Sequence, residues 1–482
     1  MQKITGKKKL ILYGCSGLGV NMLTLVMGSY LCSALLTGGF DESDIGFWTY
    51  SNSNLVIAAV WSVMILIAKI LDGVIDIPLS SFTDRLRTRW GRRRPSILIG
   101  LVPTIAVYCL FLVPLTKSES VWNTVWFGIL LCLFYTFYTL TMLTYYATFS
   151  EITDNESDMT FLSNVKSICD VVYFSLGYAL IPLFISLKLN IRFVALIFLP
   201  LSLTMLIPLF MLKEKSTKRK KAEQSEDGTA QNEEPVRALR LGSAIACAFK
   251  DKVFLYWMLT AFVMNIGLQL FLGGINELFS SAELNQTIVM ACSFAPVPLT
   301  IFLYNKLIKK YGLGIAFKYI LIMFSIGMIV IFLCGWYAKD LSELGKNAIA
   351  IVGAVFASFA IGAFFSVSYL VPSRLAQIES EKRGASVSSM YFAVEGLVEG
   401  IAAGIATGPI LVFLKEGGDG SYISYLPIVV AVACMIAFGL SFAFPKSVSQ
   451  MGKVQKPIPA LETTPTDAPT DAPTDESKTG DD

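Results

Sequence analysis

Long apolar runs recur along the 482-residue chain, and this repetition limits its possible folds more than any other feature. A helix of about 20 apolar residues crosses the roughly 30 Å hydrocarbon core of a bilayer. Only 16% of the residues are charged, against roughly 25% in soluble proteins. The pattern predicts an all-α membrane protein with twelve transmembrane helices, at about 10–37, 51–80, 96–115, 122–150, 164–187, 192–212, 253–280, 286–307, 315–337, 347–372, 386–414 and 423–445.

The Lys and Arg residues predict the orientation, because cytoplasmic loops of membrane proteins carry an excess of them. With the N-terminus inside, basic clusters fall in the cytoplasmic segments 3–9, 85–94, 213–252, 306–310 and 374–383. The opposite loops receive only isolated cations, which are Lys117, Lys188, Arg192, Lys339, Lys346 and Lys415. We therefore expect both termini in the cytoplasm.

The chain divides at a polar, charged stretch between the sixth and seventh helices. The expected parts are a six-helix half at 1–212, a cytoplasmic linker at 213–250, a second half at 251–446 and a disordered tail at 447–482. Basic loops containing Gly91 and Gly312 follow the second and eighth helices, a weak sign of a repeated half. Helix eleven carries Gly396, Gly400, Gly404 and Gly408, whose spacing of four favours close helix packing over a moving gate.

Three charged residues on helix two, Lys69, Asp72 and Asp76, suggest a cation site. The two Asp are four residues apart, so both carboxylates project from one face of the helix. Each would cost about 2.5–3.5 kcal/mol in a bilayer unless a partner or a cavity relieves it. A Lys69–Asp72 ion pair alone would account for one Asp and leave Asp76 unexplained, so we expect cation coupling.

Residues 69–95, which include these three and an Arg-rich loop ending in Pro95, resemble the glycoside–pentoside–hexuronide cation symporters of the major facilitator superfamily. The resemblance implies a bacterial inner-membrane carrier in which Thr139 completes the cation site. Ile75 stands where the family has a polar ligand, which leaves Na+ or H+ open as the coupling ion. The resemblance also implies a cytoplasmic latch in the Arg-rich loop, formed by Asp84, Arg85, Arg92 and Arg93.

The same resemblance predicts a sugar site in which several family residues are replaced. Asn21 stands at the position of a sugar-binding carboxylate, and Tyr146 at that of an aromatic residue that stacks on the sugar. Glu395 falls where the family has Lys, and these replacements argue against galactosides and acidic sugars. The expected substrate-binding set is Asn21, Tyr138, Tyr145, Tyr146, Lys166, Glu395 and Glu399, and Asn265, Gln269 and Glu277 on helix seven are further candidates for contact. For Lys166, an ion pair with Asp170 is an equal alternative.

The expected function is cation-coupled sugar uptake by alternating access, with a small-molecule substrate and membrane lipids as partners. His is absent, and neither a nucleotide-binding glycine loop nor a metal-ligand cluster occurs, so we expect no enzyme, no cofactor and no nucleic-acid partner. A monomer is expected by analogy with the family. The alternatives are a carrier of a non-sugar solute, such as a lipid or organic metabolite, and a transporter-like sensor.

Overall fold

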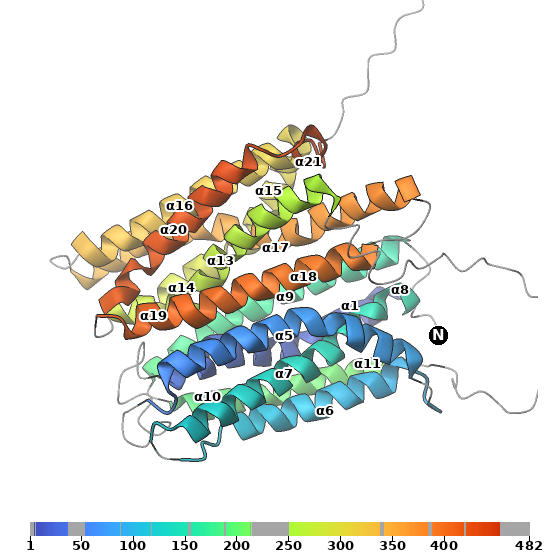
Figure 1. The fold of residues 1–482 in the computed structure, drawn as a ribbon, viewed down its shortest axis with the longest axis horizontal. Helices are drawn as coiled ribbons and strands as arrows, with labels where there is room; N and C mark the ends of the chain where they lie inside the picture. The colour runs from blue at the N-terminus through green and yellow to red at the C-terminus, as the bar shows by residue number, and fades with distance from the viewer. Residues whose placement is uncertain are drawn as a thin grey trace, which may run out of the picture.

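Helices that run nearly parallel to one another make up the computed structural model of this protein (Figure 1). The structure describes residue 4 and residues 6–36, 54–86, 88–116, 118–152, 156–187, 189–212, 214, 250–337, 342–383, 388–418 and 421–453. Within these residues, twelve helical spans are long and apolar enough to cross a membrane, which confirms the predicted number. The chain is therefore a multi-pass membrane protein.

The first six spans lie together in the lower part of Figure 1. Their helices are α1 (Lys7–Gly14), η1 (Cys15–Gly17), α2 (Leu18–Leu25), η2 (Val26–Leu31), α3 (Cys32–Ala34), α5 (Ala58–Arg85), α6 (Arg93–Phe111), α7 (Val121–Ala147), α8 (Phe149–Ile152), α9 (Glu156–Ser186), α10 (Ile191–Phe198), η3 (Leu199–Met205) and α11 (Leu206–Met211). The elements from α1 to α3 follow one another directly and form the first span.

The second six spans lie in the upper part of Figure 1. Their helices are α13 (Lys252–Ser281), α14 (Gln286–Phe294), α15 (Val297–Tyr311), α16 (Leu313–Tyr337), α17 (Glu343–Arg383), α18 (Ser388–Ile405), η5 (Ala406–Ile410), α19 (Leu411–Glu416), η6 (Ser421–Tyr425), α20 (Leu426–Ser441) and α21 (Lys446–Ser449). Helix α14 ends just before Pro296, which lies at the start of α15. A proline lacks the N–H that would continue the helix without interruption.

The two groups of helices meet along α5 and α18, and again along α9 and α14. We call the end of the bundle that holds Lys7, Arg92 and Arg93 the basic end, at the right of Figure 1, and the opposite end the far end. Because α1 starts at the basic end, α5 and α7 run from the far end toward it, and α9, α13 and α18 run away from it. This direction fixes which residues share a level of the bundle.

The glycines of helix eleven lie against helix two, as the packing interpretation predicted. A Cβ atom on Gly400 would lie 2.7 Å from the backbone oxygen of Lys69, and one on Gly404 would lie 2.9 Å from Leu66. On the facing helix, a Cβ on Gly73 would lie 2.7 Å from the oxygen of Gly396. The absence of side chains thus lets α5 and α18 approach backbone to backbone.

The glycines of the two basic loops both have a positive φ. Gly91 has a φ of 89° and Gly312 a φ of 90°, values that a residue with a Cβ rarely adopts. The two glycines lie in different settings, because Gly91 forms an isolated bridge with Thr88 and Gly312 caps the C-terminus of α15.

The start of the expected disordered tail is folded. Helix α21 and the residues after it pack against α16, where the Leu313 N–H donates to the Met451 oxygen at 3.0 Å. Val448 and Met451 are buried, and burial of these apolar side chains stabilises the packing of residues 447–453. Residues 454–482, and the linker apart from Glu214 and Lys250, lie outside the described residues.

Candidate transport site between the two halves

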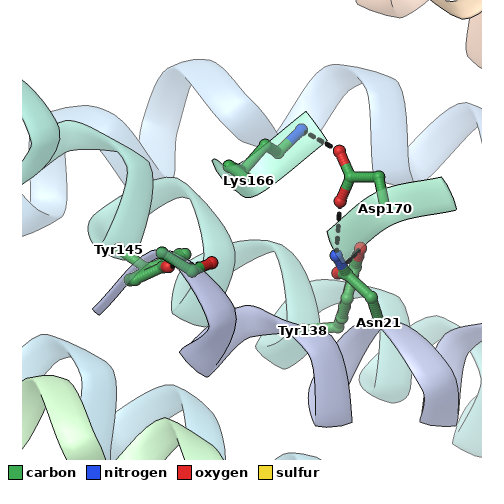
Figure 2. A network of polar contacts seen from close by, with 6 residues as sticks. Asn21, Tyr138, Tyr145, Lys166 and Asp170 are labelled. Carbon is green, nitrogen blue, oxygen red and sulfur yellow. Dashed lines mark hydrogen bonds and ion pairs between the residues drawn. The ribbon is translucent and has the colours of Figure 1, made fainter. Parts of the chain in front are cut away.

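A polar network joins three helices of the first half (Figure 2). The Tyr138 hydroxyl on α7 donates to Asn21 Oδ1 on α2 at 3.0 Å, and Asn21 Nδ2 donates to Asp170 Oδ1 on α9 at 3.3 Å. Asp170 Oδ2 then pairs with Lys166 Nζ at 2.5 Å. We call these four residues the polar cluster. It offers both hydrogen-bond donors and acceptors within a membrane-spanning bundle, which suits a ligand rich in hydroxyl groups.

The predicted aromatic residues differ in their surroundings. Lys166 Nζ lies 4.9 Å from the ring centroid of Tyr146, whose side chain is 36% exposed. Tyr145 is fully buried, and its hydroxyl donates to the backbone oxygens of Tyr13 (2.6 Å) and Gly14 (3.1 Å). Figure 2 shows Tyr145 apart from the dashed network of the polar cluster. The structure thus brings Tyr146 to the polar cluster and places Tyr145 in packing against the first span.

The predicted cation-coupling residues lie where α5 passes α7 and α18. Thr139 Oγ1 donates to Asp72 Oδ1 at 2.7 Å, so these two predicted ligands are in direct contact. Lys69 Nζ lies 4.0 Å from the ring centroid of Tyr135, and the structure gives it no ion pair with Asp72 within 4.0 Å. Asp76 is directed at α18, where a Cβ on Gly396 would lie 3.7 Å from its Oδ2. Asp76 therefore faces the boundary between the halves, whereas Asp72 contacts α7 of its own half.

Glu395 and Glu399 on α18 contact α13 in the same half. Trp257 Nε1 donates to Glu395 Oε1 at 3.1 Å, and Asn265 Nδ2 donates to Glu399 Oε1 at 3.2 Å. Glu395 is buried, and its Oε2 has no hydrogen-bond partner among the described residues. Neither carboxylate joins the polar cluster in this conformation, and their role as substrate ligands stays a prediction.

The Arg-rich turn at the basic end is organised by a carboxylate that the sequence did not single out. Glu214 accepts hydrogen bonds from the Arg93 backbone N–H, at 3.0 Å to Oε2 and 3.3 Å to Oε1. A carboxylate at the start of a helix, here α6, is favoured by the unpaired N–H groups there. Arg93 is buried and Arg92 half-buried, whereas the side chains of Asp84 and Arg85 lie outside the described residues. The latch role of these four residues stays a prediction.

A buried ion pair at the far end was also missed. Lys415, expected in a loop, lies at the end of α19 and is 5% exposed, and its Nζ is 2.5 Å from Glu277 Oε1 on α13. The same ammonium group donates to the Ser33 hydroxyl of α3, in the other half. Lys415 follows an apolar helix directly, and this position is a sequence signal that could have marked it as buried.

Comparison with known protein families identifies the chain. The family described as MFS/sugar transport protein matches residues 12–442, which is most of the chain. The protein belongs to this family. Family membership makes the chain a transporter and not an enzyme, as predicted, and agrees with the resemblance carried by residues 69–95.

Two curated proteins are similar to parts of this family member. An uncharacterized symporter of Synechocystis is 29% identical over 131 residues, which cover 26% of this chain and 23% of the relative. A lactose permease of Lactobacillus helveticus is 25% identical over 189 residues, covering 38% of this chain and 28% of the relative. In each case the match spans less than a third of the relative's length, so their activities do not transfer directly.

Solved transporter structures share the fold over nearly the whole chain. A mutant of the nucleoside transporter NupG superposes with a TM-score of 0.60 at 15% identity, covering 91% of this chain and 98% of that one. A POT family transporter in complex with 5-aminolevulinic acid gives 0.62 at 12% identity, covering 92% and 97%. At such identities the likeness establishes the major facilitator fold and nothing about the substrate.

Proposed function

We propose that this protein is a secondary active symporter that couples uptake of a sugar or glycoside to Na+ or H+. One observation carries the proposal. Two adjacent residues of α7 hold both parts of the site: Tyr138 contacts Asn21 of the polar cluster, and Thr139 contacts Asp72. A shift of α7 on cation binding would therefore move a sugar ligand as well, which is the physical requirement for coupling.

The polar cluster is the proposed sugar site. Its amide, carboxylate, phenol and ammonium groups match the paired donors and acceptors of sugar hydroxyls. Tyr146, beside Lys166 and partly exposed, offers an aromatic face for the apolar side of a sugar ring. A lipid carrier would instead need a mostly apolar cavity.

Asp72, Asp76 and the Thr139 hydroxyl form the proposed cation site. Carboxylate and hydroxyl oxygens suit Na+, and a carboxylate can equally carry a proton. Cation binding would neutralise charge at the boundary between α5 and α18 and favour movement of one half against the other. We place the basic end in the cytoplasm of a bacterial cell, with 1–212 and 251–446 as the moving halves.

The first test measures the melting temperature of the purified protein with a panel of mono- and disaccharides. Each is measured in Na+ and K+ buffers and at two pH values. A sugar at 100 times its Kd should stabilise the folded state by about 2.7 kcal/mol. We expect a sugar-dependent rise that increases with Na+ or with low pH. A folded protein that responds to no sugar would contradict the proposal and favour a non-sugar carrier.

Thr139 gives the coupling half of the proposal a sharper test. Thr139→Val keeps the side-chain shape but removes the hydroxyl, leaving Asp72 without this hydrogen bond at a cost of about 1–3 kcal/mol. A factor of ten in an equilibrium constant corresponds to 1.4 kcal/mol, so a loss of about 1 kcal/mol corresponds to roughly fivefold. We therefore expect the cation-dependent part of the sugar response to fall by at least this factor. Thr139→Ser retains the hydroxyl and serves as the matched control. Equal cation dependence in both variants would remove Thr139 from the site.

A further inference from the structure

Lysines gather at the basic end of the second half, on its outer helices. They lie at the end of α15, near the start of α16 and around α21, and they are Lys306, Lys309, Lys310, Lys318, Lys446 and Lys453. We call this set the lysine rim. All but Lys318 are exposed, and Lys318 is half-buried. The rim is separate from the candidate transport site, because none of its members belongs to the polar cluster or to the proposed cation site.

The lysines come together because the residues after α20 pack onto the turn between α15 and α16 (Figure 1). The Leu313 N–H, beside that turn, donates to the Met451 oxygen at 3.0 Å. A Cβ on Gly312, within the turn, would lie 2.6 Å from the Ser449 oxygen. The two lysines around α21 therefore lie at the same edge of the bundle as the lysines that end α15.

Carboxylates are absent from the chain segments that carry the lysine rim. No Asp or Glu occurs in residues 284–339 or in residues 420–461. Among the described residues, no lysine of the rim has a carboxylate oxygen within 4.0 Å of its Nζ. The nearby basic segment of α17 differs, since Lys382 pairs with Glu379 at 3.7 Å. The rim is therefore a surface of one charge sign, which attracts anions.

Lys318 gives an independent sign that the anion lies in the membrane. It is five residues beyond the start of α16, about 7.5 Å along the helix at 1.5 Å per residue. Its Nζ lies 3.7 Å from the ring centroid of Phe442, whose side chain is 64% exposed at the end of α20. A charge within a span is costly without a partner, and an aromatic face compensates it only in part. A phosphate in the headgroup layer would supply the counter-charge.

Apolar and aromatic side chains beside the rim are exposed, as contact with lipid chains requires. Ile315 and Tyr319 are one turn apart on α16, and both are exposed. Tyr311 at the end of α15 is exposed as well, and Lys310 Nζ lies 4.8 Å from its ring centroid. A positive rim beside an apolar surface matches a phospholipid, whose anionic headgroup adjoins its acyl chains. An acidic protein would match the charge alone.

We propose that the lysine rim binds the headgroups of anionic phospholipids in the surrounding bilayer, with Lys318 as the deepest contact. Each lysine contributes roughly fivefold to the binding constant, which corresponds to about 1 kcal/mol. Because the lysines come from two segments of the chain, a bound lipid would hold the α15–α16 turn and the residues around α21 together. The inference does not depend on the transported solute.

The test measures lipid binding to the purified full-length protein by native mass spectrometry. The probes are dioleoylphosphatidylglycerol, which is anionic, and dioleoylphosphatidylcholine, which has no net charge. We expect the wild type to bind the anionic lipid at least roughly tenfold more tightly. Lys318→Gln, and the double variant Lys309→Gln with Lys310→Gln, should each weaken this binding at least roughly fivefold. Inorganic phosphate, which lacks acyl chains, should not displace the lipid at equal concentration.

The double variant Lys8→Gln with Lys9→Gln is the matched control. Both lysines are exposed on α1 at the same end of the bundle, so this variant removes the same charge outside the rim. Its affinity for phosphatidylglycerol should stay within about twofold of the wild type. Equal losses in the two double variants would show diffuse attraction to the basic end and would overturn the site. Equal binding of both lipids by the wild type, wild-type affinity in either rim variant, or displacement by inorganic phosphate would also overturn it.

Discussion

Glu277 and Lys415 form a buried ion pair, although the sequence places Lys415 in a loop. Both side chains are almost fully buried, at 1% and 5% exposed, and their charged atoms lie 2.5 Å apart. A buried ion pair adds little net stability, but removing one partner leaves the other charge uncompensated. Lys415 also donates a hydrogen bond to Ser33 in the other half, so loss of the pair would weaken the contact between the halves.

Glu277→Gln should therefore destabilise the protein by about 3–5 kcal/mol, because Lys415 would keep its charge without a counter-ion. The measurement is the melting temperature of the purified variant. The double variant Glu277→Gln with Lys415→Met removes both charges and should recover most of the loss. If the single variant is as stable as the wild type, the ion pair does not hold this end of α13 and α19 together.

At the scale of elements, α5 and α18 matter most because they carry the predicted carboxylates and form the boundary between the halves. Their glycines let the two backbones meet, as the hypothetical Cβ contacts of Gly73 and Gly400 indicate. Asp76 lies beside Gly396 at this boundary. A change in the spacing between α5 and α18 would therefore change the position of Asp76 in the proposed cation site.

Gly400→Ala should lower both the melting temperature and the rate of transport, since the added methyl would lie 2.7 Å from the Lys69 oxygen. Gly439→Ala in α20 is the matched control, because a Cβ there has nothing within 4 Å. On helix propensity alone, each change should stabilise by roughly 0.5–1 kcal/mol. A rise in melting temperature for both variants would mean that the helices separate easily at Gly400.

On the scale of the whole molecule, direct contacts between the halves close the far end. The Tyr178 hydroxyl donates to the Leu272 backbone oxygen at 2.9 Å. The Tyr178 ring stacks on the Phe294 ring, with 4.4 Å between the ring centroids. Asn276 Nδ2 donates to the Ser29 oxygen at 3.3 Å. Alternating access would require these contacts to break whenever the far end opens.

Tyr178→Phe should favour the state with an open far end, because it removes one hydrogen bond between the halves, worth about 0.5–1.5 kcal/mol. Cys32, three residues beyond Ser29 toward the far end, is buried and lines a cavity between the two halves. In a variant that keeps Cys32 as its single cysteine, the rate of maleimide labelling should rise roughly two- to tenfold. This factor follows from the loss of about 0.5–1.5 kcal/mol, which raises the population of the open state.

Tyr304→Phe is the control for this prediction. Tyr304 is buried in the second half, and its hydroxyl has no hydrogen-bond partner among the described residues, so its loss should leave the labelling rate unchanged. Equal rates in the wild type and in Tyr178→Phe would show that this contact does not hold the far end closed.

The sequence alone determined the number of spans, and the resemblance of residues 69–95 indicated the family and implied that Thr139 of α7 meets the carboxylates of α5. Span number follows from runs of apolar residues, and the spacing of Asp72 and Asp76 follows from helical periodicity, which are both local properties. The glycine stripe on helix eleven likewise predicted close packing before its partner helix was known.

Only the tertiary structure decided the partner of each polar side chain. Tyr145 and Tyr146 are neighbours in sequence, yet one hydroxyl is bound to the first span and the other ring faces Lys166. Likewise, Lys415 reads as a loop cation in the sequence but is buried against Glu277. The reason is physical: periodicity fixes which residues share a helix face, whereas the rotation of that face toward a neighbour depends on how all the helices pack.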